Sequence, residues 1–227
     1  MKQMLFILLS IAGFLSLVNA QTSTSEKEPY LSWTASEAEN IGKSMRDNGK
    51  VGSSWDLRGI KTDRAINYKL RATLLTPEVI RAAARLEQLR NRLTDDQTRR
   101  LVADAEAAGD IIVMIEIDPN EGSGVVPLDW RVFLQPRGLK AGQTGAVTGL
   151  KSPQLRNVKA LSGTARRDYD YDVFWVVFPV LDENNQALFA DNLSQLELLV
   201  GIYKSEGRVV WQLPESIRAK IRSISKK

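Results

Sequence analysis

The residues whose spacing could support chemistry are acidic. Asp168, Asp170 and Asp172 alternate with two tyrosines, and in an extended strand their three carboxylates share one face. Carboxylates at this spacing repel each other unless a positive charge lies among them. The basic stretch just before them, which ends in Arg166 and Arg167, is the expected neutralising partner. A metal ion or a cationic ligand is the alternative.

Two other acidic segments offer oxygen ligands of the kind that calcium prefers. They are residues 118–124 (DPNEGSG) and residues 182–186 (DENNQ). In the first segment the glycine comes one position too early for a calcium loop, and the second has no glycine. Turns are rich in Asp, Asn and Gly for backbone reasons alone. The sequence therefore predicts no metal site, and it predicts no cofactor.

Histidine and cysteine are both absent, and this limits catalysis more than any other feature. It excludes Ser-His-Asp and Cys-His nucleophiles, zinc thiolate and histidine metal sites, and histidine pH switches. The chemistry that remains is a carboxylate pair, as in glycoside hydrolysis, or a Ser-Lys dyad. The candidate acids are Glu116, Asp118, Asp129, Asp170 and Asp172. No motif places two of them at a catalytic separation, so we predict no catalytic residue.

A third hypothesis comes from residues 137–167, which form a long basic loop in this interpretation. The segment holds seven Lys or Arg residues and no acid. Such an arm could bind acidic glycans or lipid headgroups. It contains no aromatic residue on which bases could stack, and an exported protein does not meet nucleic acid as its natural target. Nucleic acid is therefore not an expected partner.

The N-terminus predicts export. Lys2 precedes an apolar run, and the small residues Val18 and Ala20 come three and one positions before a cleavage site. We interpret residues 1–20 as a signal peptide, with an uncleaved anchor as the alternative. The mature chain would begin with a flexible leader at residues 21–29 and carry no membrane span. We expect it in the periplasm or outside the cell.

The elements that must position these residues centre on residues 171–180 (YDVFWVVFPV). Apolar side chains fill both faces of this expected strand. It must therefore be covered on both sides, either inside a sandwich or beneath helices. Pro179, which lacks an amide donor, should end the strand.

Residues 76–109 predict a helical hairpin. Thr76 is an N-cap, and a capping box starts a second helix at Thr94. Gly109 should close that helix in a left-handed conformation. The expected apolar stripe of the first helix is Val79, Ala82, Leu86, Leu89 and Leu93.

Other strands are predicted at residues 65–75, 110–118, 128–135, 196–203 and 208–213. In the strand at 128–135, Leu128 and Trp130 should point inward. The strands at 196–203 and 208–213 should form a hairpin around residues 204–207. A helix should follow Pro214 to the C-terminus. Trp33 and Trp55 are expected as packing anchors, with a sugar-stacking platform as the alternative.

These elements predict one domain, residues 30–227, that is mainly β with an α insertion. The expected fold is an antiparallel β-sandwich of immunoglobulin-like type that carries the helical hairpin and a C-terminal helix. The alternative is an α+β fold with the hairpin packed on one sheet face. The functional expectation is an exported, non-enzymatic envelope module that contacts an unknown protein or cell-surface partner. A carboxylate-based hydrolase and a polyanion binder are the alternatives.

Overall fold

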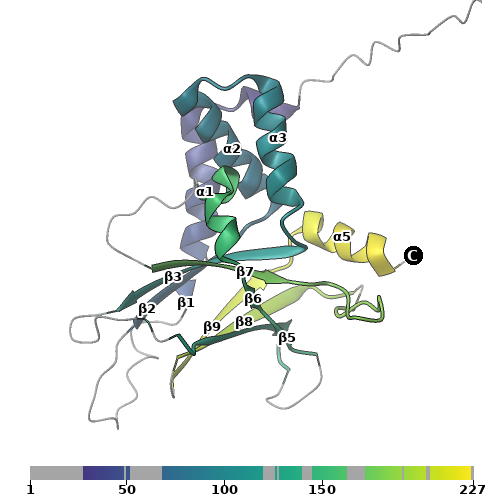
Figure 1. The fold of residues 1–227 in the computed structure, drawn as a ribbon. Helices are drawn as coiled ribbons and strands as arrows, with labels where there is room; N and C mark the ends of the chain where they lie inside the picture. Colours follow the sequence, from purple (N-terminus) through teal and green to yellow (C-terminus); the bar gives the residue numbers. More distant parts are fainter. Residues whose placement is uncertain are drawn as a thin grey trace, which may run out of the picture.

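The computed structural model describes residues 28–48, 50–51, 68–119, 126, 128–139, 145–162, 172–190, 192–202 and 205–225. Within these ranges the strands form two antiparallel sheets (Figure 1). As far as the sheets are described, one has the order β1-β2-β3-β7-β6 and the other β5-β4-β8-β9. The first sheet consists of β1 (Lys50–Val51), β2 (Tyr68–Leu74), β3 (Ile111–Pro119), β7 (Asp172–Phe178) and β6 (Leu150–Lys151). The second consists of β5 (Val147–Thr148), β4 (Arg131–Pro136), β8 (Gln195–Ile202) and β9 (Ser205–Gln212).

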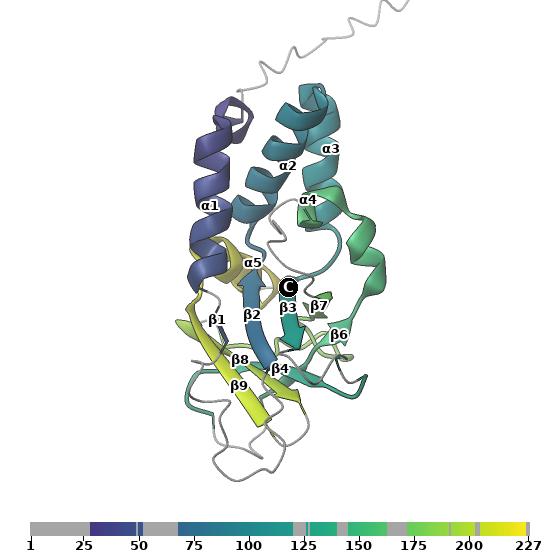
Figure 2. The same ribbon diagram turned by 90° about the vertical axis from the view of Figure 1, so that its left-hand side faces the viewer.

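Helices cover the β1-β2-β3-β7-β6 sheet on one side, and the second sheet lies on the other side (Figures 1 and 2). The core accordingly has two parts. One hydrophobic cluster contains buried residues of both sheets and of the C-terminal helix, and the other contains residues of the helices, β3 and β7. The described helices are η1 (Pro29–Ser32), α1 (Ala35–Asn48), α2 (Pro77–Asn91), α3 (Asp95–Glu106), η2 (Pro153–Asn157), α4 (Lys159–Ser162) and α5 (Glu215–Ser225).

Strand β7 is covered on both faces, as the sequence predicts. Val173 and Trp175 belong to the cluster beneath the helices, whereas Val176 and Phe178 belong to the cluster between the sheets. Successive side chains of a strand point to opposite faces, so each apolar face needs its own cover. The strand ends at Phe178, directly before Pro179, which also agrees with the prediction.

The inserted hairpin of α2 and α3 is confirmed, and it joins two neighbouring strands. Strands β2 and β3 pair directly over seven residues, although the two helices separate them in the chain. Buried residues of both helices lie in the same cluster as Ile112 and Met114 of β3. The hairpin thus packs on one face of a sheet, as the α+β alternative requires.

The helix starts are confirmed because local side chains determine them. The Thr76 side chain accepts a hydrogen bond from the backbone N–H three residues later. Thr94 and Gln97 each bind the backbone N–H of the other, which is a complete capping box. Thr34 and Glu37 make the same exchange at α1, and these hydrogen bonds hold the pKa of the Glu37 carboxyl below its usual value.

The predicted cap at Gly109 is wrong. Helix α3 ends at Glu106, and its C-cap Ala107 is right-handed, with a φ of −78°. The left-handed cap occurs instead after α2, at Arg92 (φ 54°). Gly109 is required for a different reason, because a Cβ at this position would overlap Cγ1 of Val177 in β7.

The predicted apolar stripe of α2 is only partly correct. Val79 and Ala82 are buried, but Leu89 is 42% exposed. Leu89 lies in the last turn of α2, at the end of the helix that stands away from the sheets (Figure 1). The heptad pattern identifies a face of the helix, but it does not tell how far along the helix that face is covered.

Two described strands, β4 and β9, start three residues away from their predicted positions. Leu128 is 97% exposed, because β4 begins three residues later, whereas Trp130 is 3% exposed and points inward as expected. In the final hairpin, Ile202 pairs with Ser205. Strand β9 therefore starts within the segment that the sequence assigns to the turn. Composition identifies strands well, but it locates their ends poorly.

The segment 137–167 is not one continuous loop in its described part. It contains β5, β6, η2 and α4. Gly149 lies between β5 and β6, at the point where the chain passes from one sheet to the other. Its N–H donates to the carbonyl of Val132 at 2.9 Å. A Cβ on Gly149 would overlap Cγ1 of Val176 and lie 2.8 Å from Cε1 of Phe178.

Trp33 is half-buried against the cluster beneath the helices, and its ring lies 6.3 Å from that of Tyr30 in an edge contact. This agrees with a packing role. Trp55, the signal peptide at 1–20 and residues 21–27 of the leader lie outside the described residues. Among the helices that are described, none has the length and apolar character needed to cross a bilayer.

Candidate functional site

The acids considered for catalysis do not converge where they are described. Glu116 is 3% exposed, on the face of β3 that the helices cover. Its cross-strand partner is Val173. Because successive side chains of a strand alternate, the neighbouring Asp172 points to the opposite face of the sheet. Asp129 is exposed in the turn before β4. Asp170 and the side chain of Asp118 lie outside the described residues.

The other acidic segments are described only in part. Residues 163–171 and 120–125 lie outside the described ranges, so the neutralisation predicted at 168–172 stays a prediction. In the 182–186 turn, Asp182 Oδ1 accepts the N–H groups of Asn184 and Gln186, each at 2.8 Å, which is a backbone role. In the part of the chain that is described, no group of three or more acids is arranged to hold a metal ion.

Several cations of the 137–167 segment are bound to the body of the protein. Arg137 donates to Gln195 at 2.8 Å, and Lys159 lies 3.6 Å from a glutamate of α2. Lys151 Nζ donates to the carbonyl of Trp130 at 2.7 Å and lies 3.9 Å from the centre of its ring. Partial burial lowers the pKa of Lys151, and the charge of Asp129 opposes this shift. These three side chains contact the body of the protein, although Arg137 and Lys159 remain exposed.

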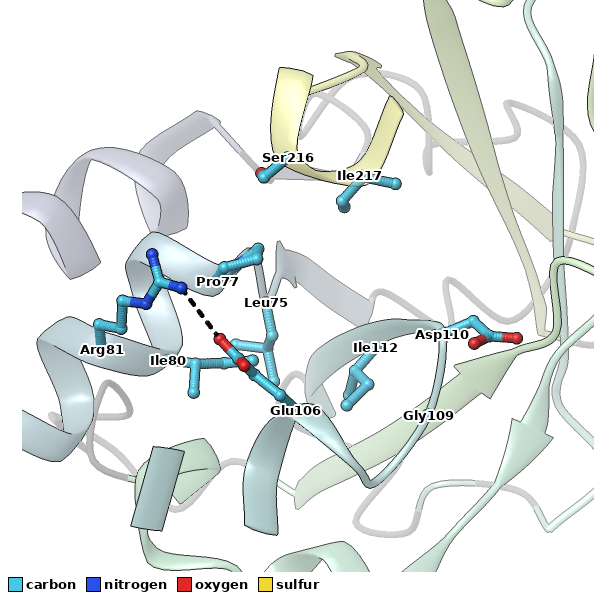
Figure 3. A pocket seen from close by; sticks show the side chains of 10 residues that line it. All are labelled: Leu75, Pro77, Ile80, Arg81, Glu106, Gly109, Asp110, Ile112, Ser216 and Ile217. Carbon is cyan, nitrogen blue, oxygen red and sulfur yellow. Dashed lines mark hydrogen bonds and ion pairs between the residues drawn. The ribbon is translucent and has the colours of Figure 1, made fainter. Parts of the chain in front are cut away.

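A groove of about 470 Å³ opens where several elements meet (Figure 3). The first turns of α2 and α5 form one part of its wall, and the end of α3 with the start of β3 forms the other. Figure 3 shows the lining residues around a common space, with the carboxylate of Asp110 pointing away from the other side chains. The apolar lining consists of Leu75, Pro77, Ile80, Ile112 and Ile217.

The base of this groove is held by the pairing of two neighbouring strands. The N–H of Leu75 donates to the carbonyl of Ile112 at 2.9 Å, which extends the contact of β2 and β3 up to the start of α2. Gly109 lets the chain pass close to β7 before β3 begins. On the other wall, Ile217 anchors α5 in the cluster between the sheets.

The groove carries charge at both ends. At one end, Arg81 Nη2 lies 3.5 Å from Glu106 Oε1. At the other end lies Asp110 (Figure 3). Its carboxylate accepts the N–H of Val180 at 3.1 Å. Ser216 also lines the groove and donates to Glu78 at 3.4 Å. A recess that is bordered by both apolar and charged residues is a candidate binding site.

We expect the Arg81–Glu106 pair to add little to stability. The two side chains are 42% and 39% exposed, and their contact is long, so solvent screens it. A double-mutant cycle with Arg81→Ala and Glu106→Ala, followed by urea unfolding, should give a coupling of about 0.2–1 kcal/mol. A coupling above about 2 kcal/mol would contradict this and mark the pair as structural.

The groove was not foreseen from the sequence. The sequence marks Pro77 as a helix start and Gly109 as a helix end. The lining residues come from three stretches of the chain, 75–81, 106–112 and 216–217, which share no motif. No protein-family model, no curated protein and no solved structure matches the chain. The function is therefore inferred from the groove and from the sequence itself.

Proposed function

We propose that this protein is an exported, non-enzymatic module that docks a partner protein in the periplasm or outside the cell. The groove between α2, α3 and α5 carries the proposal, because it combines an apolar floor with charged groups at both ends. Export is supported by the signal-type pattern of residues 1–20. Binding without chemistry is supported by the complete lack of His and Cys.

We also propose that the two sheets form a β-sandwich of immunoglobulin-like type within a single domain, residues 30–227. The shared hydrophobic cluster supports this arrangement, because it contains inward residues of β2, β3 and β7 together with those of β4, β8 and β9. Ile217 and Ile221 of α5 belong to the same cluster. These strands and α5 thus contribute to one cluster, which supports the proposal of a single domain.

The two alternative functions, a carboxylate-based hydrolase and a polyanion binder, have less support. A carboxylate-based hydrolase needs two acids that face the same space, but Glu116 and Asp172 lie on opposite faces of their sheet. A polyanion-binding arm needs cations that are free to bind, and three of its seven cations, Arg137, Lys151 and Lys159, contact other parts of the molecule.

Filling the groove tests the proposed function. Ser216→Trp places a large side chain in the groove at the half-exposed first turn of α5. Ser194→Trp is the matched control, at an exposed position that does not line the groove. The purified full-length chain is used to capture partners from a cell-envelope fraction, and each bound protein is quantified.

We expect one partner to be retained by the wild type and by Ser194→Trp, and to fall by about tenfold or more with Ser216→Trp. A tenfold loss corresponds to about 1.4 kcal/mol, a small part of what a docked side chain contributes. Urea midpoints of the three proteins should agree. Equal capture by all three, or capture by none, would overturn the proposal.

A further inference from the structure

We infer that Asn192 is an N-glycosylation site, at which an oligosaccharide is attached to the side-chain amide. Asn192, Leu193 and Ser194 form an Asn-X-Ser motif, the acceptor sequence for this modification in secreted proteins. No other asparagine of the chain is followed two positions later by serine or threonine. The inference goes beyond docking, and it rests on the export that the proposed function includes.

The fold places the two polar residues of the motif at the surface. Asn192 lies in the turn that precedes β8, and both Asn192 and Ser194 are exposed. Leu193, between them, is partly buried and packs against the cluster between the sheets. The apolar residue of the motif is therefore directed inward, while the amide and the hydroxyl group that define the motif are open to solvent. This is the arrangement that an acceptor site on a folded protein needs.

Contacts on both sides hold this turn in place. The N–H of Leu193 donates to the carbonyl of Ala190 at 3.0 Å, and the carbonyl of Ser194 accepts the N–H of Leu213 at 2.8 Å. Before and after the turn, Phe189 and Leu196 are at most 2% exposed in the cluster between the sheets. The motif is thus presented on the outside of a packed segment, and a sugar on Asn192 requires no change in the core.

The modification transfers a sugar from an activated donor. The donor class is an oligosaccharide joined through its anomeric carbon to a lipid diphosphate. Nδ2 of Asn192 attacks this carbon, so an N–C bond forms while the C–O bond to the diphosphate breaks. The lipid diphosphate leaves with the electron pair of that bond, and one proton of Nδ2 passes to a base of the transferase. The exchange needs no oxidant and no reductant.

A glycan at this position is compatible with the proposed docking function. Neither Asn192 nor Ser194 lines the groove between α2, α3 and α5. The sugar would cover the surface at the start of β8, where two exposed polar side chains lie next to each other in the chain apart from Leu193. The two proposals therefore concern different parts of the surface.

The test is the intact mass of the chain purified from the cells that produce it, followed by mass spectrometry of its peptides. We expect the wild type to exceed the mass of its polypeptide by that of one oligosaccharide, carried on the peptide that contains Asn192. Asn192→Gln should lose this whole increment, because the acceptor amide is removed from the motif. Ser194→Ala should lose it too, although Asn192 is still present.

Two matched controls should keep the increment. Ser194→Thr preserves the motif, because threonine also carries the required hydroxyl group. Asn184→Gln changes another exposed asparagine in a turn, which lies outside any such motif. A wild-type chain without sugar, an increment that survives Asn192→Gln or Ser194→Ala, or an increment lost with Asn184→Gln would each overturn the inference.

The glycosylation and the docking function fail in different ways. If the exported wild type carries no sugar but Ser216→Trp still abolishes capture of a partner, the modification is wrong and docking stands. If Asn192 carries the sugar but no captured partner depends on the groove, docking is wrong and the modification stands. An unmodified chain that stays inside the cell would overturn both, since each rests on export.

Discussion

Replacing Trp175 by alanine should lower the free energy of unfolding by about 3–5 kcal/mol, the range found when large buried aromatic side chains are removed. Trp175 is 5% exposed in the cluster beneath the helices. Small proteins have a free energy of unfolding of about 5–15 kcal/mol, so this single change would remove a large part of it. Urea unfolding followed by circular dichroism measures the loss.

The same loss should follow on the other face of β7. Phe178 is 0% exposed in the cluster between the sheets, and Phe178→Ala should also cost about 3–5 kcal/mol. Leu150→Ala is the control, because Leu150 is 63% exposed on the adjacent strand, and it should change stability by less than about 0.5 kcal/mol. A loss on only one face would show that β7 is covered on that face alone.

Trp175→Phe distinguishes the contribution of side-chain volume from that of hydrogen bonding by the indole N–H. The indole Nε1 of Trp175 is buried without a hydrogen-bond partner among the described residues. Phenylalanine therefore removes no hydrogen bond and leaves only a smaller ring. We expect a cost of about 1 kcal/mol, well below that of alanine. A cost equal to that of alanine would mean that the indole N–H has a partner.

The second large effect is expected at Gly149. Gly149→Ala places a Cβ onto Cγ1 of Val176 and 2.8 Å from Cε1 of Phe178, and both of these side chains are 0% exposed. Neither can move without disturbing the core. We expect a loss of about 1–3 kcal/mol, which is typical of overpacking, again measured by urea unfolding.

Gly201→Ala is the matched control for this crossing. Gly201 also lies in the sheets, in β8, but nothing comes within 4 Å of a Cβ built on it. Alanine should be neutral or slightly stabilising there, because glycine weakens strands through its conformational entropy. If both substitutions had the same effect, steric contact at the sheet crossing would not be the reason for glycine at 149.

Local interactions explain why much of the secondary structure was predictable. The capping box at Thr94 and the N-cap at Thr76 involve residues three positions apart, so the sequence contains the whole interaction. The two-sided apolar pattern of residues 173–178 likewise required a cover on each face, and helices supply one while the second sheet supplies the other.

Non-local contacts explain the errors. Gly109 looked like a helix cap, but its actual constraint is Val177, a residue far along the chain. Leu89 fits the apolar stripe of α2, yet it is exposed because its turn extends beyond the packed region. No local pattern distinguishes these cases, since the distant neighbour is missing from the window in which the pattern is read.

The sequence by itself determined the helix starts, the antiparallel strands, the doubly covered strand β7 and the lack of imidazole and thiol chemistry, because each depends on residue type and on spacing over a few positions. Only the tertiary structure decided which layer covers each face of β7, where the chain crosses between the sheets, and that three separate stretches of the chain border a groove. These features depend on contacts between residues far apart in the chain. A groove arises from such contacts alone, so it leaves no signature in the order of the residues.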